Sequence, residues 1–341
     1  MRARLCLRFS LTIICLTLAA KSAAAQLQWS SSQKYDTGQD TAVAMHASGL
    51  ILEFHRTHIL AGTELFYHVG KVIGTNVTWG GSQRVPAEGT WPNVAISKEG
   101  YVLFVWSTGL AKRSSALYYM AGKIDPNGEA NQSISWLTQP TRVDAGFHSS
   151  IAMNDNGIIA EVHESGSNGT GLYYRVGQFE NPKAGDFTIV WNSGEWGVNY
   201  DDGINPHIAF NNQNQVVEVH QVTGQHLLHY HRGVVLKNAV IDFQASQRYD
   251  NWGYEPSVAL SDGGLAVEIH RNDPNRRAYA MTGTLSLAYP ERISWSTSVD
   301  ISNEGGSIYP AVATNANYAI GTWTSSGLVT NALYYSVARI P

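Results

Sequence analysis

The amino-acid sequence predicts an all-β protein, a six-bladed β-propeller with four-stranded blades. Three observations lead to this fold class. Similar segments return about every 50 residues, which is a period typical of repeat architectures. Their apolar residues follow the two-residue alternation of strands, are rich in Val, Ile, Tyr and Trp, and show no helical period after residue 25. The first and last repeats also complement each other as two parts of one blade.

The segment 1–25 has the composition of a secretory signal peptide. Three arginines precede the apolar stretch 11–20, which is too short to span a bilayer, and three alanines precede Gln26. We therefore expect a soluble mature chain that is secreted, either extracellular or periplasmic. Both cysteines, Cys6 and Cys15, lie in this segment, so we expect neither disulfides nor thiol chemistry in the remainder.

The charge of the remaining chain excludes some classes of partner. Residues 26–341 contain 19 basic and 27 acidic residues, a net charge of −8, and no basic run. Nucleic acid and anionic membranes are therefore unfavourable partners. No apolar segment long enough to span a membrane follows residue 25.

Residues 26–341 form one predicted propeller domain of six repeats. Their approximate bounds are 27–76, 77–133, 134–187, 188–238, 239–292 and 293–341. Each repeat begins with an aromatic strand of the type Ile-Ser-Trp, followed by a turn-rich link and a small apolar strand. A tight turn such as Asn154–Gly157 leads into a strand of the type Glu-x-His. A variable loop and a strand of the type Leu-Tyr-Tyr complete the repeat.

The two ends of the chain predict how the ring closes. The mature chain begins on an aromatic outer strand at 27–29 and ends on a Leu-Tyr-Tyr strand at 333–340. The last blade then takes its outer strand from the N-terminal end, which leaves no open sheet edge. An open solenoid would need polar caps, and two sandwiches would need a linker; the sequence shows neither feature.

Four repeats carry a Glu and a His two residues apart. The pairs are Glu53/His55, Glu161/His163, Glu218/His220 and Glu268/His270. On a strand this spacing places both side chains on one face. They are either buried struts between blades or the polar walls of equivalent ligand-binding pockets. No fixed third partner accompanies all four pairs, so we expect no metal there and no cofactor elsewhere.

A second set of positions lies just before each small apolar strand. Its members are Asp40, Trp91, His148, Asn205, Glu255 and Tyr309, which we call the mouth residues. All six should crowd around the top opening of the propeller axis, yet all six differ. A single asymmetric site requires such divergence, although unconstrained drift of loop positions would also produce it. His148, Glu255, Asp40 and Tyr309 include suitable acids and bases.

Two tryptophans depart from the repeat pattern. Trp196 and Trp252 fall in the links that lead to the top face, and we expect them to offer an exposed stacking surface for a ligand. Asn76, Asn131 and Asn168 begin Asn-x-Ser/Thr sequons, which become glycosylated only in a host that modifies them.

In period, blade number and closure, the mature chain resembles the propeller lectins, both the fucose-binding six-bladed fungal type and the seven-bladed Photorhabdus type. That resemblance implies sugar pockets between adjacent blades, each built from an arginine, a carboxylate and an aromatic residue. The carboxylates would be Glu53, Glu161, Glu218 and Glu268. The repeated partner in this chain is His rather than Arg, which departs from the fucose-binding pattern.

Three functions follow from these patterns. The first is a secreted carbohydrate-binding protein whose equivalent pockets bind glycans multivalently. The second is a polysaccharide lyase or glycoside hydrolase with one axial site. A lyase, similar to propeller lyases of uronate polymers, would use His148 and Tyr309, with His207 as a substitute base. A hydrolase would use the carboxylates Asp40 and Glu255. The third is a propeller scaffold that binds protein. We favour carbohydrate binding on sequence grounds.

Overall fold

The computed structural model describes ten segments of the chain. These are residues 26–57, 62–109, 115–166, 169–180, 187–191, 197–273, 275–286, 291–303, 305–325 and 331–341. The segment 1–25, Trp196 and Asn168 lie outside the described residues. All regular elements in the described segments are strands, and these segments contain no helix that could cross a membrane.

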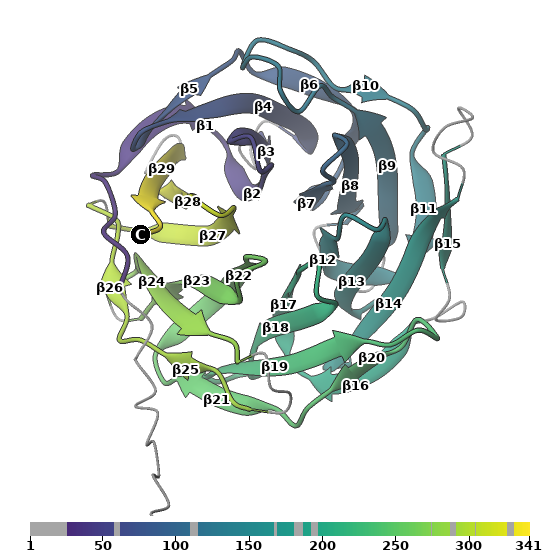
Figure 1. Ribbon diagram of the computed structural model, residues 1–341, viewed down its shortest axis with the longest axis vertical. Helices are drawn as coiled ribbons and strands as arrows, with labels where there is room; N and C mark the ends of the chain where they lie inside the picture. Colours follow the sequence, from purple (N-terminus) through teal and green to yellow (C-terminus); the bar gives the residue numbers. More distant parts are fainter. Residues whose placement is uncertain are drawn as a thin grey trace, which may run out of the picture.

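The strands form six antiparallel sheets arranged as the blades of a ring, which confirms the predicted six-bladed propeller (Figure 1). Blade 1 contains β2 (Gln39–Met45), β3 (Leu50–Arg56), β4 (Glu64–Ile73), β5 (Asn76–Trp79) and β6 (Gln83–Glu88). Blade 2 contains β7 (Thr90–Ile96), β8 (Tyr101–Ser107), β9 (Leu117–Lys123), β10 (Ser135–Trp136) and β11 (Thr141–Asp144). Blade 3 contains β12 (Gly146–Met153), β13 (Ile158–Ser165), β14 (Gly171–Glu180), β15 (Thr188–Trp191) and β16 (Val198–Asp202).

The second half of the ring repeats this organisation. Blade 4 contains β17 (Ile204–Phe210), β18 (Gln215–Gln221), β19 (Leu228–Val235), β20 (Ile241–Phe243) and β21 (Gln247–Asp250). Blade 5 contains β22 (Gly253–Leu260), β23 (Leu265–Asn272), β24 (Arg277–Thr284), β25 (Ser294–Trp295) and β26 (Val299–Asp300). Blade 6 contains β27 (Ser307–Thr314), β28 (Tyr318–Ser325), β29 (Ala332–Arg339) and β1 (Gln33–Thr37).

The outer strand of blades 1 to 5 is interrupted. Two short strands, such as β5 and β6 in blade 1, pair in succession with the same third strand and together occupy the fourth position. Each blade therefore combines three strands of one predicted repeat with the outer strand of the next. The innermost strands β2, β7, β12, β17, β22 and β27 surround the axis (Figure 1).

The ring closes as the sequence predicts. The N-terminal strand β1 pairs antiparallel with β29, from Gln33 opposite Tyr335 to Thr37 opposite Ala332. An additional bridge joins Trp29 to Ala338. The first and last strands thus complete one blade, and neither end of the chain leaves an unpaired edge at this position.

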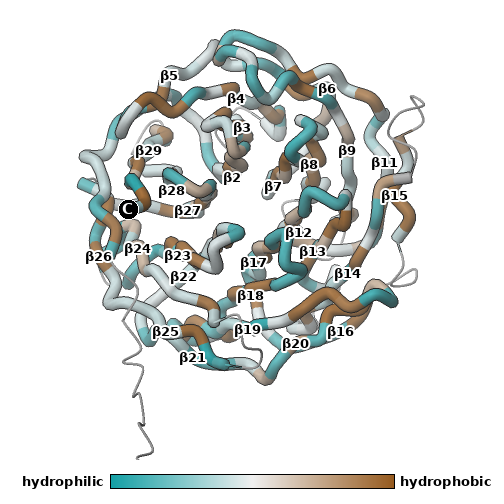
Figure 2. The backbone as a smooth tube through the Cα atoms, viewed as in Figure 1, coloured by the Kyte–Doolittle hydropathy of each residue, from teal (hydrophilic) through white to brown (hydrophobic). Residues whose placement is uncertain are grey.

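The repeated aromatic residue of the outer strand packs over a glycine of the third strand. In blade 1, Trp79 lies opposite Gly70, and a β-carbon added to Gly70 would come within 2.8 Å of the Trp79 ring. This contact explains why the Leu-Tyr-Tyr strand regularly reaches a glycine. Hydrophobic and hydrophilic residues alternate along the blades (Figure 2).

The hydrophobic core lies between neighbouring blades. At the junction of blades 1 and 2, Phe54 of β3 stacks on Phe104 of β8, with ring centroids 4.4 Å apart. Phe104 occupies the position that is Glu in four other blades. The Glu-x-His face of each strand is therefore directed at the preceding blade, and in blade 2 an aromatic side chain fills the same space.

Candidate active site

All six mouth residues adopt a left-handed backbone conformation. Their φ angles are 56° at Asp40, 54° at Trp91, 47° at His148, 52° at Asn205, 51° at Glu255 and 48° at Tyr309. At each one the pairing of the first two strands of the blade shifts register, so each residue forms a bulge. Non-glycine residues in this conformation cost on the order of 1–3 kcal/mol each and gather at functional sites.

The six bulges meet around one pocket on the axis. The mouth residues and the one or two residues that follow each of them line it, and the empty space, including its open entrance, is about 540 Å³. The structure thus brings together all six positions that the sequence predicted to crowd at the axis. A site built from six different residues is asymmetric, although the surrounding fold is a regular repeat.

Four mouth residues contact a partner of matched chemistry on the second strand of the same blade. Arg56 Nε donates to Asp40 Oδ2 at 2.5 Å, and Arg271 Nη1 lies 3.3 Å from Glu255 Oε1. In blade 3, His148 Nδ1 lies 2.5 Å from Glu164 Oε1. In blade 4, Asn205 Nδ2 donates to Gln221 Oε1 at 3.3 Å. Each acid faces an arginine, the histidine faces an acid, and the amide faces an amide.

These partners are candidate site residues that the sequence patterns did not single out. Arg56, Glu164, Gln221 and Arg271 each directly follow the His of a Glu-x-His pair. The signal that could have found them is their change of charge in step with the mouth residue of the same repeat. Such compensation is not expected of drifting loop positions.

Carboxylates also hold the bulges of neighbouring blades in place. Glu255 Oε2 accepts a hydrogen bond from the backbone N–H of Tyr309 at 2.8 Å, and Glu164 Oε1 accepts one from Asn205 at 2.7 Å. The Asp40 carboxylate similarly accepts from the backbone of Trp91. The acidic side chains are therefore fixed from two sides, by a side chain in their own blade and by the backbone of the next.

Burial makes the two acidic mouth residues, Asp40 and Glu255, easier to protonate. It raises the pKa of Asp40, while Arg56 opposes the shift. Burial likewise raises the pKa of Glu255; Arg271 opposes that shift, and the negative charge of Asp40 adds to it. Burial and the charges of Glu255 and Asp40 raise the pKa of Tyr309, so its phenol stays protonated.

An aromatic wall closes one side of the pocket. The Trp91 ring lies edge-to-face with the His148 ring, at 4.0 Å between centroids, and with the Tyr309 ring, at 4.5 Å. Nδ1 of His148 is occupied by Glu164, whereas its buried Nε2 has no hydrogen-bond partner among the described residues. Because a carboxylate only accepts, Nδ1 carries the proton and Nε2 offers a lone pair in the neutral ring.

His207, the predicted substitute base, belongs to a ring of contacts below the mouth. Its Nδ1 accepts from the backbone N–H of Val258 at 3.3 Å, as Ser257 Oγ does from Val312 at 3.1 Å. Burial lowers the pKa of His207 to about 4. Its lone pair is engaged in joining two blades, which disfavours a role as a base.

The Glu-x-His pairs are buried between blades. Their exposed fractions are at most 2% for Glu53, His55, Glu161, His163, Glu218, His220, Glu268 and His270. In each pair Nδ1 of the His lies about 3 Å from the Glu carboxylate. Tyrosines from the preceding blade add hydrogen bonds, such as Tyr249 to Glu268 at 2.9 Å. Ligand binding would require accessible side chains, so this geometry favours the alternative of buried struts between blades over that of ligand-binding pockets.

Trp252 lies on the surface, in the link between β21 and β22. Its side chain is 61% exposed, and it stands three residues before Glu255. The guanidinium carbon of Arg271 lies over the ring of the neighbouring Tyr254, 4.6 Å from its centroid. The same ring packs against His226. The predicted exposure of Trp252 is confirmed, and its role in stacking on a ligand stays a prediction. Asn76 and Asn131, which begin two sequons, are also exposed.

Comparison of the whole chain with solved structures shows the same fold in several proteins. A protein of unknown function from Dyadobacter fermentans has a TM-score of 0.62 and 12% identity, covering 91% of this chain and 99% of that one. An α-L-arabinofuranosidase from Fusarium graminearum has a TM-score of 0.60 and an α-L-arabinanase from Penicillium chrysogenum 0.59. Each is 10% identical and covers 91% of this chain and 98% of its own.

These similarities show a propeller fold that is shared with carbohydrate-active enzymes. No protein-family model matches the chain, and no curated protein matches it in sequence. The solved neighbours include glycoside hydrolases.

Proposed function

We propose that this protein is a glycoside hydrolase with a single site on the propeller axis. The observation that carries the proposal is the pair of acids at the mouth, the buried Asp40 and the largely buried Glu255, each held by its own arginine on a left-handed bulge. Two positioned carboxyl groups are what most glycoside hydrolases use. The similarity to arabinan-cleaving propellers supports this alternative over multivalent sugar binding.

The environments of the two acids suggest different roles. Arg56 contacts Asp40 at 2.5 Å and favours its ionised form, whereas Arg271 lies farther from Glu255, at 3.3 Å. The charge of Asp40 further raises the pKa of Glu255. Glu255 therefore acts as the general acid that protonates the leaving oxygen. Asp40 acts on the anomeric carbon, as nucleophile or through an activated water.

The remaining mouth residues would bind the sugar. The aromatic wall of Trp91 and Tyr309 offers a ring face, and Trp252 provides a stacking surface. The substrate class is a glycan or polysaccharide outside the cytoplasm, in keeping with the predicted leader at 1–25.

A second candidate is β-elimination from a uronate polymer. It is favoured by the state of His148, because Glu164 occupies Nδ1 and the opposite nitrogen is left as a base. Tyr309, kept protonated by its raised pKa, would supply the acid. The hydrolase remains our proposal because the two axial carboxyls carry the most specific arrangement.

Incubation of the mature chain with a panel of arabinans, other neutral polysaccharides and uronate polymers tests the proposal. The expected result is release of new saturated reducing ends from at least one polymer. Unsaturated ends from a uronate polymer would establish the lyase instead. Tight binding of several glycans without any cleavage would instead support the carbohydrate-binding function that we favour on sequence grounds.

A further inference from the structure

Two inter-blade junctions contain an unassigned cluster of two histidines and one aspartate. The first is formed by Asp36, His55 and His68, and the second by Asp201, His220 and His231. In each, one ligand atom per residue lies within 4.8 Å of the others. We propose that both clusters are zinc-binding sites that fasten neighbouring blades together.

The aspartate reaches the cluster from the preceding blade, which is why sequence spacing alone offers no third ligand. Asp36 belongs to β1, the strand that closes blade 6, whereas His55 and His68 belong to β3 and β4 of blade 1. Asp201 likewise comes from β16 of blade 3, and its histidines come from β18 and β19 of blade 4. A bound ion would therefore join two sheets, and at the first site it would secure the closure of the ring.

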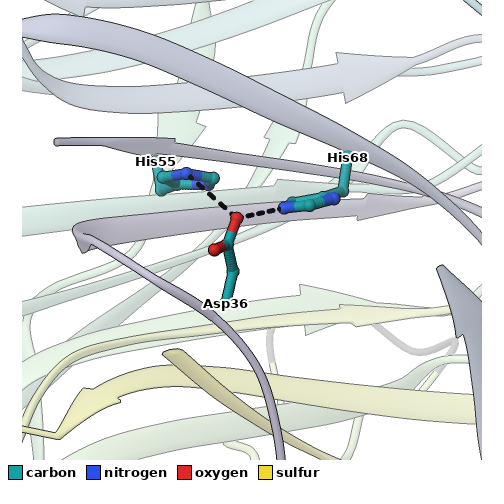
Figure 3. A group of neighbouring side chains, drawn as sticks. All are labelled: Asp36, His55 and His68. Atoms are coloured by element: carbon teal, nitrogen blue, oxygen red, sulfur yellow. Dashed lines mark hydrogen bonds and ion pairs between the residues drawn. The ribbon is translucent and has the colours of Figure 1, made fainter. Parts of the chain in front are cut away.

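The histidines are oriented as metal ligands usually are. In blade 1, Nδ1 of His55 faces the Glu53 carboxylate at 3.0 Å, and Nδ1 of His68 faces the carbonyl of Gly80 at 2.9 Å. Both partners can only accept, so Nδ1 carries a proton in each ring and Nε2 is the nitrogen available to a metal. Figure 3 shows both Nε2 atoms directed at one oxygen of Asp36.

The second cluster reproduces this arrangement. Nδ1 of His220 faces Glu218 at 3.1 Å, and Nδ1 of His231 faces the carbonyl of Gln244 at 2.7 Å. The Nε2 atoms of the two rings lie 3.5 and 2.8 Å from Asp201 Oδ2. The two sites lie on opposite sides of the ring, in blades 1 and 4 (Figure 1).

The distances suit a tetrahedral ion after small shifts. Nε2 of His55 lies 3.9 Å from Asp36 Oδ2, beyond hydrogen-bonding distance, and Nε2 of His68 lies 2.7 Å from it. Ligand atoms around zinc stand about 3.3 Å apart, midway between these values. Asp36 is 29% exposed on its side chain, which leaves a water-accessible fourth position.

The equivalent position in blade 3 places a different cation beside the aspartate. There Arg175 replaces the second histidine, and its Nη2 lies 2.5 Å from Asp144, next to His163. At the junction of blades 2 and 3, a permanent cation on blade 3 thus neutralises the aspartate of blade 2 where the second imidazole is missing. In blade 5 the corresponding residue is Met281, opposite Glu268. Only blades 1 and 4 therefore combine two imidazoles with a carboxylate among the described residues.

Zinc binding requires a deprotonated Nε2 on each imidazole, so zinc affinity should weaken as the solution becomes more acidic.

Zinc titration of the full mature chain by calorimetry, after treatment with a chelator, tests the proposal. The wild type is expected to bind two zinc ions per chain. H68R and H231R, which copy the arginine of blade 3, should each bind one, and the double variant none. Zinc should also raise the thermal midpoint of the wild type but not of the double variant.

D36N is a second variant for the first site that leaves both histidines in place. It should bind one ion, and its own thermal midpoint in chelator reports whether it is folded. A wild type that binds no zinc, or an H68R or D36N protein that still binds two ions, would overturn the proposal and leave the clusters as ion pairs. Neither outcome depends on the proposed hydrolase activity.

Discussion

Replacing Glu255 by glutamine is expected to lower glycosidic-bond cleavage by about 10²–10⁴-fold, the usual contribution of a general acid. Glutamine keeps an oxygen that can accept the N–H of Tyr309, so the bulge of blade 6 should persist. The measurement is the rate of reducing-end release on a substrate found in the panel. D40N should cause a loss of similar size, because the second carboxyl is equally required.

E99Q is the matched control, since it removes one negative charge from an exposed turn far from the mouth. It should retain the wild-type rate. If E255Q also retained the wild-type rate, Glu255 would not be the acid and the proposed site would be wrong.

The pH dependence of the same reaction tests the role of Glu255 as general acid independently. A general acid must be protonated, so activity should fall as pH rises through the pKa of Glu255. Burial and the charge of Asp40 raise that pKa, which places this loss above the ordinary range of a glutamate. The residual activity of E255Q should lack this descending limb.

The second large effect is on stability. Replacing Glu268 by alanine is expected to lower the free energy of unfolding by about 3–5 kcal/mol, because a buried ionic partner is removed. Glu268 is fully buried and accepts hydrogen bonds from Tyr249 and His270, which would both lose their acceptor. Denaturant unfolding of E268A and wild type measures the difference.

E268Q is the control for this prediction, because it retains one carbonyl acceptor and a similar volume. It should lose less stability than E268A. An E268A protein as stable as the wild type, but with impaired glycan binding, would contradict the role of a strut and restore the pocket interpretation for these residues.

The regular features of the fold could be predicted from the sequence because they recur. The Glu-x-His strand of blades 1, 3, 4 and 5 and the glycine under the outer aromatic of blades 1 to 5 follow from packing that recurs around the ring. Closure by β1 followed from the phase of the repeat, since the chain begins on an outer strand and ends on inner ones. The six mouth positions could be located for the same reason.

Which residues form the site was harder to predict. The alternation of residues along a strand does not show whether a neighbouring blade covers the polar face of that strand. The spacing of Glu161 and His163 placed them together, but their burial depends on the preceding blade. Arg56 and Arg271 lie at strand ends, at a position where arginine does not recur in every blade. Their role could be inferred only after the structure placed them opposite Asp40 and Glu255. The aspartates Asp36 and Asp201 were separated from their histidines by a blade boundary.

The central claim is that one axial site, rather than several equivalent pockets, carries the carbohydrate chemistry of this protein. Calorimetric titration of E255Q with an oligosaccharide of the substrate tests it most directly, because this variant should bind without cleaving. The account predicts one oligosaccharide per chain, with binding lost when Trp91 is also replaced by alanine. Four oligosaccharides per chain, unaffected by that replacement, would contradict it.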